Sequence, residues 1–458
     1  MTQHFDAIVI GTGQAGPPLS ARLSAAGMKV AIIERGRFGG TCVNTGCIPT
    51  KTLIASAYAA QLARRAGEYG VSVGTVSVDM KAVKARKDQI SGRSNHGVEQ
   101  WVRGLANATV FQGHARFERA DAVRVGDALL EAERIFINVG GRAQVPTMPG
   151  LDSVSYLTNS TMMDVDFLPE HLVIVGGSYV GLEFGQMYRR FGSKVTIVEK
   201  GTRLIRREDE DVSQAVREIL ENEGIDVQLD ATCLSARRDG DGIAVGLDCA
   251  GGGREVAGSH LLLAVGRVPN TDDLGLDRAG VAIDARGYIE VDEQLRTNVP
   301  GIWALGDCNG RGAFTHTAYN DYEIVAANLF DGDPRKVSDR ITAYAMYIDP
   351  PLGRVGMTLA EAKQTGRRLL VGTRPMTRVG RAVEKGESQG FMKVIVDADS
   401  HAILGASILG VTGDEVVHGM LDVMAAGAPY TTISRAMHIH PTVSELVPTL
   451  LQDLHPVE

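Results

Sequence analysis

The sequence predicts an α/β fold made of two Rossmann-like dinucleotide-binding domains and a C-terminal α+β domain. An apolar strand followed by a glycine-rich turn occurs twice, and each copy leads to a second strand that ends in a carboxylate. From about residue 340 the pattern changes to alternating strands followed by helices. With 458 residues, 44% of them hydrophobic, the chain is long enough to bury two or three cores.

The first dinucleotide-binding unit begins with FDAIVIGTGQAG near the N-terminus. Gly11, Gly13 and Gly16 form a GxGxxG turn, and Glu34 ends the next strand 23 residues after Gly11. Glycine lets the backbone approach a pyrophosphate, the following helix offers its free amides, and the carboxylate accepts hydrogen bonds from a ribose. These residues are therefore expected to bind a dinucleotide.

The second unit repeats this design in HLVIVGGSYVG, where Gly176 and Gly181 keep the glycine positions and Ser178 replaces the middle one. Glu199 follows Gly176 by the same 23 residues. A serine leaves less room for a pyrophosphate than a glycine does. Two copies with matched carboxylates are still far stronger evidence than one, so the chain is expected to hold two dinucleotides.

The remaining segments extend these units and add the third domain. Residues 261–270 predict a buried strand that runs into a turn, and a further strand is expected to end at Gly306 and Asp307. Residues 392–410 predict two strands joined by a turn at DADS, with helices following toward the C-terminus.

Charge and hydropathy argue against two classes of partner. The formal net charge is −8 and the lysines and arginines are scattered, so no basic surface for nucleic acid is expected. The first residues, MTQHFDAIVIG, lack a basic segment followed by an apolar core, and no run of eighteen apolar residues occurs. The sequence therefore predicts a cytoplasmic protein without a membrane partner.

Two of the five cysteines, Cys42 and Cys47, lie close together in GGTCVNTGCIPTK. In a reducing compartment such a pair is more often reactive or metal-binding than structural. An ideal helix would separate them by about 140°, so pairing requires an irregular turn, which Asn44 and Gly46 tolerate. Pro49 suits the first turn of a helix that begins here, where a thiolate is stabilised. A redox-active dithiol is therefore favoured.

A metal site and an inert pair are the alternatives. Zinc sites use four ligands with C-x2-4-C spacing, and Cys233, Cys249 and Cys308 do not form a second pair. We therefore expect no metal site, and we expect these three cysteines to be small packed residues.

The chain also resembles a known family. Six of its motifs occur in the same order in the flavoprotein disulfide reductases, the class I pyridine nucleotide-disulfide oxidoreductases that include glutathione reductase, dihydrolipoamide dehydrogenase and mercuric reductase. The motifs are GTGQAG, GGTCVNTGCIPTK, GGSYVGLEFG, AVGRVPN, TNVPGIWALGD and HIHPTVSE. The resemblance covers nearly the whole chain.

The resemblance implies a homodimer that binds FAD on the first unit and NADH or NADPH on the second. It divides the chain into a FAD-binding domain at residues 1–148 and 269–338, an NAD(P)H-binding domain at 149–268 and a dimerisation domain at 339–458. Electrons would pass from the nicotinamide through FAD to a redox-active disulfide, and from there to an acceptor.

The roles of the redox residues follow from the resemblance. Cys42 is expected to attack the acceptor as a low-pKa thiolate, and Cys47 to contact the flavin as a charge-transfer thiolate. Lys51 is expected at the reactive edge of the flavin, paired with Glu183, and Asp307 at its ribityl chain.

Further positions match cofactor contacts of the family. Tyr179 matches the tyrosine that covers the nicotinamide pocket, although ordinary packing would also explain it. Gly40, Thr41 and Gly266 lie within the matching motifs and are expected to line the dinucleotide sites.

In the family, a histidine of an H-P-T segment reaches the active site of the other subunit and acts there as general acid and base. His440 has this position, and Glu445 is expected to orient it. A structural alternative for Glu445 is the T-x-x-E capping box that starts at Thr442. His438 is expected to be structural, and His316 either to contact FAD or to cap the following helix.

The choice of nicotinamide depends on the second carboxylate. Glu199 favours NADH, because a carboxylate repels a phosphate on the ribose. Arg203, Arg206 and Arg207 follow closely and could admit NADPH.

Three hypotheses remain for what the chain reduces. A small or protein-bound disulfide fits His440, because the leaving thiolate needs a proton donor. CIPTKTL, NDYEIV, DPPLGRVGMT and PYTTI instead resemble the mercuric-reductase-like branch that includes the reactive-chlorine-resistance flavoproteins, whose acceptors are metal ions or oxidants. True mercuric reductases carry a C-terminal cysteine pair, whereas the last cysteine here is Cys308. A flavin redox sensor without turnover is the weakest of the three.

Overall fold

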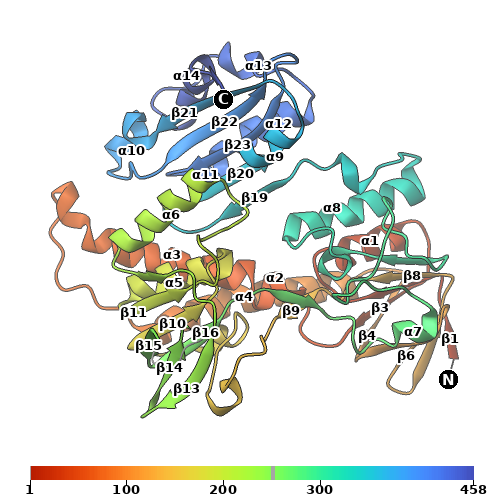
Figure 1. Cartoon of the computed structure of the whole chain (residues 1–458). Coiled ribbons are helices and arrows are strands. Elements are labelled where there is room, and N and C mark those ends of the chain that lie inside the picture. Colours follow the sequence, from red (N-terminus) through yellow and green to blue (C-terminus); the bar gives the residue numbers. More distant parts are fainter. Residues whose placement is uncertain (1, 249–252, 458) are drawn as a thin grey trace.

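The computed structural model of the chain describes residues 2–248 and 253–457, which are arranged in three parts (Figure 1). The N-terminal part and the central part lie side by side in the view, and the C-terminal part, drawn in blue, lies above the central part (Figure 1). Within the described ranges, no helix is both long and apolar enough to span a membrane.

A parallel five-stranded sheet, in the order β18-β8-β2-β3-β4, forms the core of the first part. Its strands are β2 (Ala7–Ile10), β3 (Val30–Glu34), β4 (Ala108–Gln112), β8 (Arg134–Ile137) and β18 (Ile302–Ala304). β2 and β3 are buried at every position, which explains why both are apolar runs rather than alternating patterns. Because β18 comes from much later in the chain, two separate segments build this sheet.

Helices cover one face of this sheet and a second sheet covers the other. The helices are α1 (Gly16–Ala25), α4 (Met80–Arg103) and α8 (Thr315–Ala326). The second sheet, which carries α7 (Leu276–Ala279) beside it, consists of β1 (Thr2–His4), β5 (Ala115–Arg119), β6 (Ala122–Val125) and β7 (Ala128–Glu131). Two helices follow β3, namely α2 (Gly40–Asn44) and α3 (Cys47–Arg64), and α3 packs both against α4 and against α5 (Tyr179–Phe191) of the second part.

The second part repeats the βαβ arrangement that the sequence predicts. Its parallel sheet has the order β12-β11-β10-β16. The strands and connecting helices are β10 (His171–Val175), α5 (Tyr179–Phe191), β11 (Lys194–Val198), α6 (Glu210–Asn222), β12 (Asp226–Gln228) and β16 (His260–Leu263). An antiparallel sheet packs against it and contains β13 (Ser235–Asp239), β14 (Gly242–Gly246) and β15 (Glu255–Gly258).

A short antiparallel pair, β9 (Gly141–Ala143) with β17 (Arg267–Pro269), lies where the chain passes between the two parts. The sequence predicts only a turn at the second of these segments. It is a strand because residues 141–143 supply the hydrogen-bonding partner, and no local pattern indicates such a distant partner.

The third part is an antiparallel sheet in the order β19-β20-β23-β22-β21-β24, flanked by short helices. The strands are β19 (Ala343–Met346), β20 (Leu352–Gly356), β21 (Leu369–Pro375), β22 (Phe391–Asp397), β23 (Ile403–Leu409) and β24 (His455–Pro456). The helices are α9 (Leu359–Gln364), α10 (Gly380–Glu384), α11 (Gly413–Val416), α12 (His418–Ala425), α13 (Thr431–Ser434) and α14 (Val447–Gln452). The predicted strand–turn–strand is confirmed by β22 and β23.

Candidate functional site

A large cavity of about 2690 Å³ is lined by all three parts of the chain. An ordinary small-molecule pocket has about 300–1,000 Å³. The cavity is lined by most of the residues that the sequence singles out, namely Gly11, Gly13, Glu34, Gly40, Thr41, Cys42, Cys47, Lys51, Gly176, Tyr179, Glu183, Glu199, Gly266 and Asp307. Gly16, Gly181, His440 and Glu445 are not among its lining residues.

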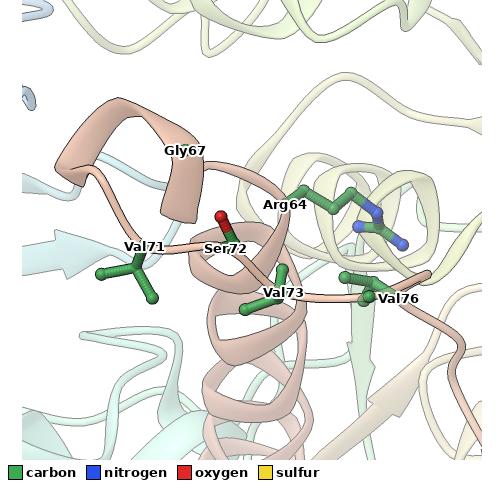
Figure 2. Close-up of a pocket in the computed structure, with 7 residues that line it drawn as sticks. Arg64, Gly67, Val71, Ser72, Val73 and Val76 are labelled. Carbon is green, nitrogen blue, oxygen red and sulfur yellow. The ribbon is translucent and has the colours of Figure 1, made fainter.

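A smaller pocket of about 490 Å³ lies beside the end of α3 (Figure 2). Val71, Val73 and Val76 line it, together with Arg64, whose guanidinium donates to the carbonyl oxygen of Arg190. Its described lining includes no thiol, imidazole or carboxylate. The candidate redox site is therefore the large cavity.

The first glycine turn has no room for side chains. Gly11 has a φ of +102°, and a Cβ atom there would lie 2.3 Å from the carbonyl oxygen of Asn138. A Cβ atom on Gly16 would lie 2.1 Å from the carbonyl oxygen of Gly11. Helix α1 can therefore start this close to β2 only with glycine at these positions.

The second turn has the same geometry. Gly176 has a φ of +119°, and a Cβ atom there would lie 2.3 Å from the carbonyl oxygen of Ala264. A Cβ atom on Gly181 would lie 2.0 Å from the carbonyl oxygen of Gly176. Ser178, which replaces the middle glycine, is exposed with an extended backbone, so the serine fits this turn without strain.

The two strand-ending carboxylates each bind their own turn. Glu34 accepts hydrogen bonds from the amide and the hydroxyl of Thr12, at 3.0 and 2.6 Å. Glu199 accepts from the amides of Gly177 and Gly201, at 2.6 and 2.7 Å. Each carboxylate is thereby fixed beside the turn that is expected to hold a pyrophosphate, where a ribose can reach it.

A buried donor without a partner marks the first turn as a binding site. Nδ2 of Asn138 is buried and has no hydrogen-bond partner among the described residues. It lies 3.2 and 3.0 Å from the positions that Cβ atoms on Gly13 and Gly16 would occupy. A buried unsatisfied donor is rare in a native protein and is typical of a place where a ligand completes the hydrogen bonding. Together with the cavity volume, this fits a dinucleotide such as FAD.

Asp307 lies on the wall of the same cavity, in a 3₁₀ turn (Gly306–Asn309) that follows β18. Burial raises the pKa of its carboxyl group, and the Arg267 guanidinium, with Nε 3.5 Å from Oδ2, acts in the opposite direction. The strand that the sequence expects to end at Gly306 and Asp307 ends at Ala304.

Cys42 and Cys47 lie on two consecutive helices, with Thr45 and Gly46 between them. Cys42 belongs to α2 and is half-buried, and Cys47 is the first residue of α3 and is exposed. Both are free thiols. Because one helix ends at Asn44 and the next begins at Cys47, the irregular turn and the helix start that the sequence predicts are confirmed.

The reduced pair carries its negative charge on Cys47. A hydrogen bond from Cys42 is the largest cause that lowers the pKa of Cys47, to about 6. The hydroxyl of Thr315, 3.2 Å from Sγ, and the charge of Lys51 also favour the thiolate. The pKa of Cys42 is raised, because its thiol donates to Cys47 and is partly buried. The expected low-pKa thiolate at Cys42 is therefore wrong for the reduced pair in a single chain.

Lys51 and Glu183 form an ion pair between α3 and α5, with Nζ 2.7 Å from Oε2. The second oxygen of Glu183 accepts from the amide of Tyr347 at 2.9 Å. Lys51 Nζ also lies 4.6 Å from the centre of the Tyr347 ring, a cation–π contact. The predicted pairing is therefore present, and it fixes the lysine charge on the cavity wall.

Tyr179 is the first residue of α5, one turn before Glu183. Its ring makes edge contacts with Tyr344 and Phe314, at centroid distances of 5.6 and 6.1 Å, and burial raises the pKa of its hydroxyl. Along α5 it therefore lies between the second glycine turn and Glu183, on the cavity wall.

His440 lies outside the cavity, on an exposed segment of the third part. Its Nδ1 lies 2.9 Å from Oε2 of Glu445, and its side chain is 80% exposed. The hydroxyl of Thr442 accepts from the amide of Glu445 at 3.2 Å, so one half of the predicted capping box also exists. The Glu445 carboxylate, however, binds His440 rather than completing the box. A single chain does not place His440 among the residues that line the cavity around the cysteines.

Two other histidines are fixed by backbone carbonyls. Nδ1 of His438 lies 3.2 Å from the carbonyl oxygen of Ala436, on an exposed segment. Nε2 of His316 lies 2.7 Å from the carbonyl oxygen of Ala343. His316 does not cap α8, as the sequence allowed, because it lies inside that helix and Thr317 makes the capping contact.

The remaining cysteines differ from one another. Cys308 is buried in the first core, which confirms that it is a packed residue. Cys233 is disulfide-bonded, so the interpretation that it only packs is wrong, and Cys249 lies outside the described residues. Among the residues described, no group of three or more His, Cys, Asp or Glu side chains is placed to hold a metal ion.

Sequence reasoning missed three residues of the site: Asn138, Thr315 and Tyr347. Asn138 directly follows β8, and Thr315 lies within the segment that drew attention to His316. Tyr347 carries no motif signal at all. Each reaches the site through contacts with residues far away in the sequence.

Two family models match the chain. The model for pyridine nucleotide-disulphide oxidoreductases matches residues 5–321, and the model for the dimerisation domain of the same family matches residues 342–451. Together they span most of the sequence.

Individual proteins match along nearly their whole length. The probable pyridine nucleotide-disulfide oxidoreductase RclA of Escherichia coli is 34% identical, over 96% of this chain and 97% of that protein. Mercuric reductase of Streptomyces lividans is 33% identical (96% and 94%), and dihydrolipoyl dehydrogenase of Cupriavidus necator is 32% identical (98% and 97%). The structure of a Cu(II) complex of the HOCl-induced flavoprotein disulfide reductase RclA from Escherichia coli aligns with a TM-score of 0.90, at 34% identity, over 98% of this chain and 99% of that chain.

The close approach at the second turn predicts the effect of Gly181→Ala. The new Cβ would lie 2.0 Å from a backbone oxygen, so we expect α5 to shift, unfolding to become easier by about 1–3 kcal/mol, and nicotinamide dinucleotide affinity to fall at least tenfold. Urea denaturation and calorimetric titration measure both effects. Gly97→Ala is the matched control, because nothing lies within 4 Å of its Cβ position in α4, and this variant should be as stable as the parent or more so. Equal behaviour of the two variants would contradict the packing argument.

The pKa of Cys47 predicts how alkylation of the reduced protein depends on pH. Because the pKa is lowered to about 6, the thiolate is present above this pH and is lost as the pH falls through it. The anaerobic rate of iodoacetamide modification at Cys47, followed by mass spectrometry, should be half-maximal near pH 6. In Thr315→Ala the midpoint should move upward, because the hydroxyl that favours the thiolate is gone. A midpoint above pH 8 in the parent protein would contradict the lowered pKa of Cys47.

Proposed function

The chain belongs to the pyridine nucleotide-disulphide oxidoreductase family, and we propose that it uses NADH to reduce a disulfide acceptor through the Cys42–Cys47 pair. Members of this family are FAD-dependent, so the chain is a FAD-dependent oxidoreductase. Its dimerisation domain indicates a homodimer. The observation that carries the proposal is the thiol–thiolate pair in one cavity with both glycine turns.

FAD fits the first turn and the nicotinamide dinucleotide fits the second. Gly11, Gly13 and the free donor of Asn138 would hold the FAD pyrophosphate, Glu34 its ribose and Asp307 its ribityl chain. When bound, FAD takes a hydride from the nicotinamide and supplies an electron pair to the cysteine disulfide.

Reduction of the disulfide by two electrons and one proton yields one thiol and one thiolate. The hydrogen bond between the sulfurs leaves the proton on Cys42 and the charge on Cys47. Lys51, Thr315 and the N-terminus of α3 stabilise this charge, which supports Cys47 as the sulfur nearest the flavin.

The acceptor step starts when Cys42 loses its proton, for which we propose His440 of the partner subunit as the base. The Cys42 thiolate attacks one sulfur of the acceptor disulfide and forms a mixed disulfide, and the other sulfur leaves with the proton from the imidazole. Cys47 then attacks Cys42, which restores the internal disulfide and releases the second sulfur of the acceptor as a thiolate. This thiolate takes a proton from solvent, so the two electrons end on two acceptor thiols.

Glu445 gives His440 the orientation that this step needs. Its carboxylate lies 2.9 Å from Nδ1, so the Nδ1–H donates to Glu445 and Nε2 is left to exchange the proton. The exposed position of the imidazole suits a residue that completes the site of a second subunit.

NADH is the proposed reductant because Glu199 is fixed at the second turn by two backbone amides. A carboxylate held there accepts from ribose hydroxyls and repels a phosphate. Of the three nearby arginines, Arg203 donates to the carbonyl oxygen of Arg206, and Arg207 lines the cavity. The proposal includes a cytoplasmic location, because the cytoplasm is where NADH would be supplied to the enzyme.

A metal ion is the second candidate acceptor. The RclA structure that aligns with this chain is described as a Cu(II) complex, and a thiol–thiolate pair can transfer electrons to a copper ion. The 458 residues contain no cysteine after Cys308, so the pair proposed to transfer electrons to a metal ion is Cys42 and Cys47.

Reoxidation of the reduced enzyme tests the acceptor. Enzyme reduced anaerobically with NADH should be reoxidised quickly by one of the disulfides glutathione disulfide or lipoamide, followed by flavin absorbance in a stopped-flow instrument. His440→Ala should slow this step by about 10²–10⁴-fold, because the general acid is lost. His438→Ala is the matched control and should react like the parent, since its imidazole contacts only a backbone carbonyl. Reoxidation by Cu(II) alone, with no dependence on His440, would contradict the disulfide proposal and support the metal one.

Replacing Cys47 by serine should separate its role from that of Cys42. Cys47→Ser should keep FAD bound but remove the long-wavelength absorbance of the reduced enzyme that a thiolate beside a flavin produces. Cys42→Ser should keep that absorbance and lose disulfide reduction. Spectra during anaerobic titration measure both, and an unchanged band in Cys47→Ser would refute the assignment.

A further inference from the structure

The acidic segment Glu208–Asp211, which leads into the first turn of α6, contacts the third part of the chain. Glu208 accepts from the hydroxyl of Tyr344 and lies 3.4 Å from the guanidinium of Arg354. The side chains of Glu208 and Arg354 are 0% and 1% exposed. A charged pair this deep is stable only while both partners remain, so Glu208 is a fixed acceptor for Tyr344.

Asp209 and Asp211 also bind this segment to the third part of the chain. Asp209 accepts from the backbone amides of Leu359 and Ala360, at 3.1 and 3.3 Å, and from Lys393. Asp211 also accepts from Lys393, at 2.8 Å. The position of Glu208, and with it that of the Tyr344 hydroxyl, is therefore set by several independent contacts.

Tyr344 is part of an aromatic group on the cavity wall. Its ring stacks on Phe314 at 5.5 Å with an interplanar angle of 15°, and Phe314 stacks in turn on His316 at 5.4 Å. Tyr179 rests edge-on against both Tyr344 and Phe314. Because Tyr344 is anchored at its hydroxyl and stacked on its face, it gives Tyr179 a fixed surface to pack against.

Tyr179 lies on the cavity wall between the second glycine turn and Lys51. It follows directly after the second glycine turn, and on its other side the Lys51–Glu183 pair and Cys47 line the same cavity. If the pyrophosphate binds the turn, the reactive ring would extend along this wall past Tyr179 to reach Lys51. In the position in which it contacts Tyr344, Tyr179 would cover that route.

We propose that Tyr344 is a positioning residue that holds Tyr179 in the covering position and thereby sets how easily the nicotinamide ring enters. The inference rests on the proposed use of a nicotinamide dinucleotide and goes beyond it in assigning Tyr344 and its anchor Glu208. If Tyr179 must leave Tyr344 for the ring to bind, the apparent affinity is reduced by the fraction of molecules in which Tyr179 covers the route. Weakening the contact between Tyr179 and Tyr344 raises the affinity for the nicotinamide ring and leaves the affinity for the rest of the dinucleotide unchanged.

Binding of two ligands to the holoenzyme tests this. Tetrahydro-NAD, which has a non-reducing nicotinamide ring, and ADP-ribose, which lacks the ring, are titrated calorimetrically into the parent and into Tyr344→Phe. Tyr344→Phe keeps the stack but removes the hydroxyl anchored by Glu208. Its Kd for tetrahydro-NAD should fall about three- to tenfold, the range expected for loosening one aromatic contact, and its Kd for ADP-ribose should stay unchanged.

Three further variants make the outcome decisive. In a Tyr179→Ala background, Tyr344→Phe should have no further effect. Tyr319→Phe removes a hydroxyl from an exposed side chain on α8 and should bind both ligands like the parent. If Tyr344→Phe does not fold, Glu208→Gln keeps the shape of the acceptor and should give the same shift to a smaller extent.

Two results would overturn the inference: equal Kd values for tetrahydro-NAD in the parent and the variants, or equal shifts for both ligands. Failure of the parent to bind tetrahydro-NAD would instead overturn the proposed use of a nicotinamide dinucleotide, and the inference with it.

Discussion

The ion pair between Lys51 and Glu183 joins the three parts of the chain at a single point. Lys51 belongs to α3, Glu183 to α5, and Tyr347, which contacts both through its ring and its amide, to the third part. The Glu183 side chain is only 8% exposed, and a buried carboxylate is stable only when it is paired. The reactive groups are placed relative to this pair, since Cys47 lies one helical turn before Lys51, and Tyr179 one turn before Glu183.

The two helices that supply this pair, α3 and α5, both use their N-terminus to stabilise negative charge. Each begins at the cavity wall, so the free amides and partial positive charge of its first turn face the place where a negative charge is needed. At α3 that charge is the Cys47 thiolate, and at α5 it would be the pyrophosphate of the proposed nicotinamide dinucleotide. One arrangement of turn and helix therefore suits both binding and redox chemistry, and Gln186 and Arg190 of α5 hold that helix against the third part through hydrogen bonds to Asp349.

Features that depend on residues near one another in the chain were predicted from the sequence. Features that depend on contacts between distant residues were missed. The glycine turns, the carboxylates Glu34 and Glu199 and the helix that starts at Cys47 depend on residues near each other in the chain, and their pattern was readable. Asn138, Thr315 and Tyr344 act through neighbours that the fold brings from far away, so no spacing indicated them. That the proton of the reduced pair lies on Cys42 in the single chain could not be predicted for the same reason, because it depends on which sulfur donates to the other in three dimensions. The family resemblance supplied the pairing of Lys51 with Glu183, which spacing alone could not.

The position of β18 at the edge of the first sheet has a consequence for synthesis on the ribosome. This strand pairs with β8, so the first sheet is incomplete until Ile302–Ala304 has left the exit tunnel. The central sheet uses only strands between β10 and β16 and can close earlier. During translation, β8 therefore keeps one unpaired edge while the central part folds. An exposed strand edge can pair with other chains and cause aggregation, so the nascent chain is vulnerable until β18 covers β8.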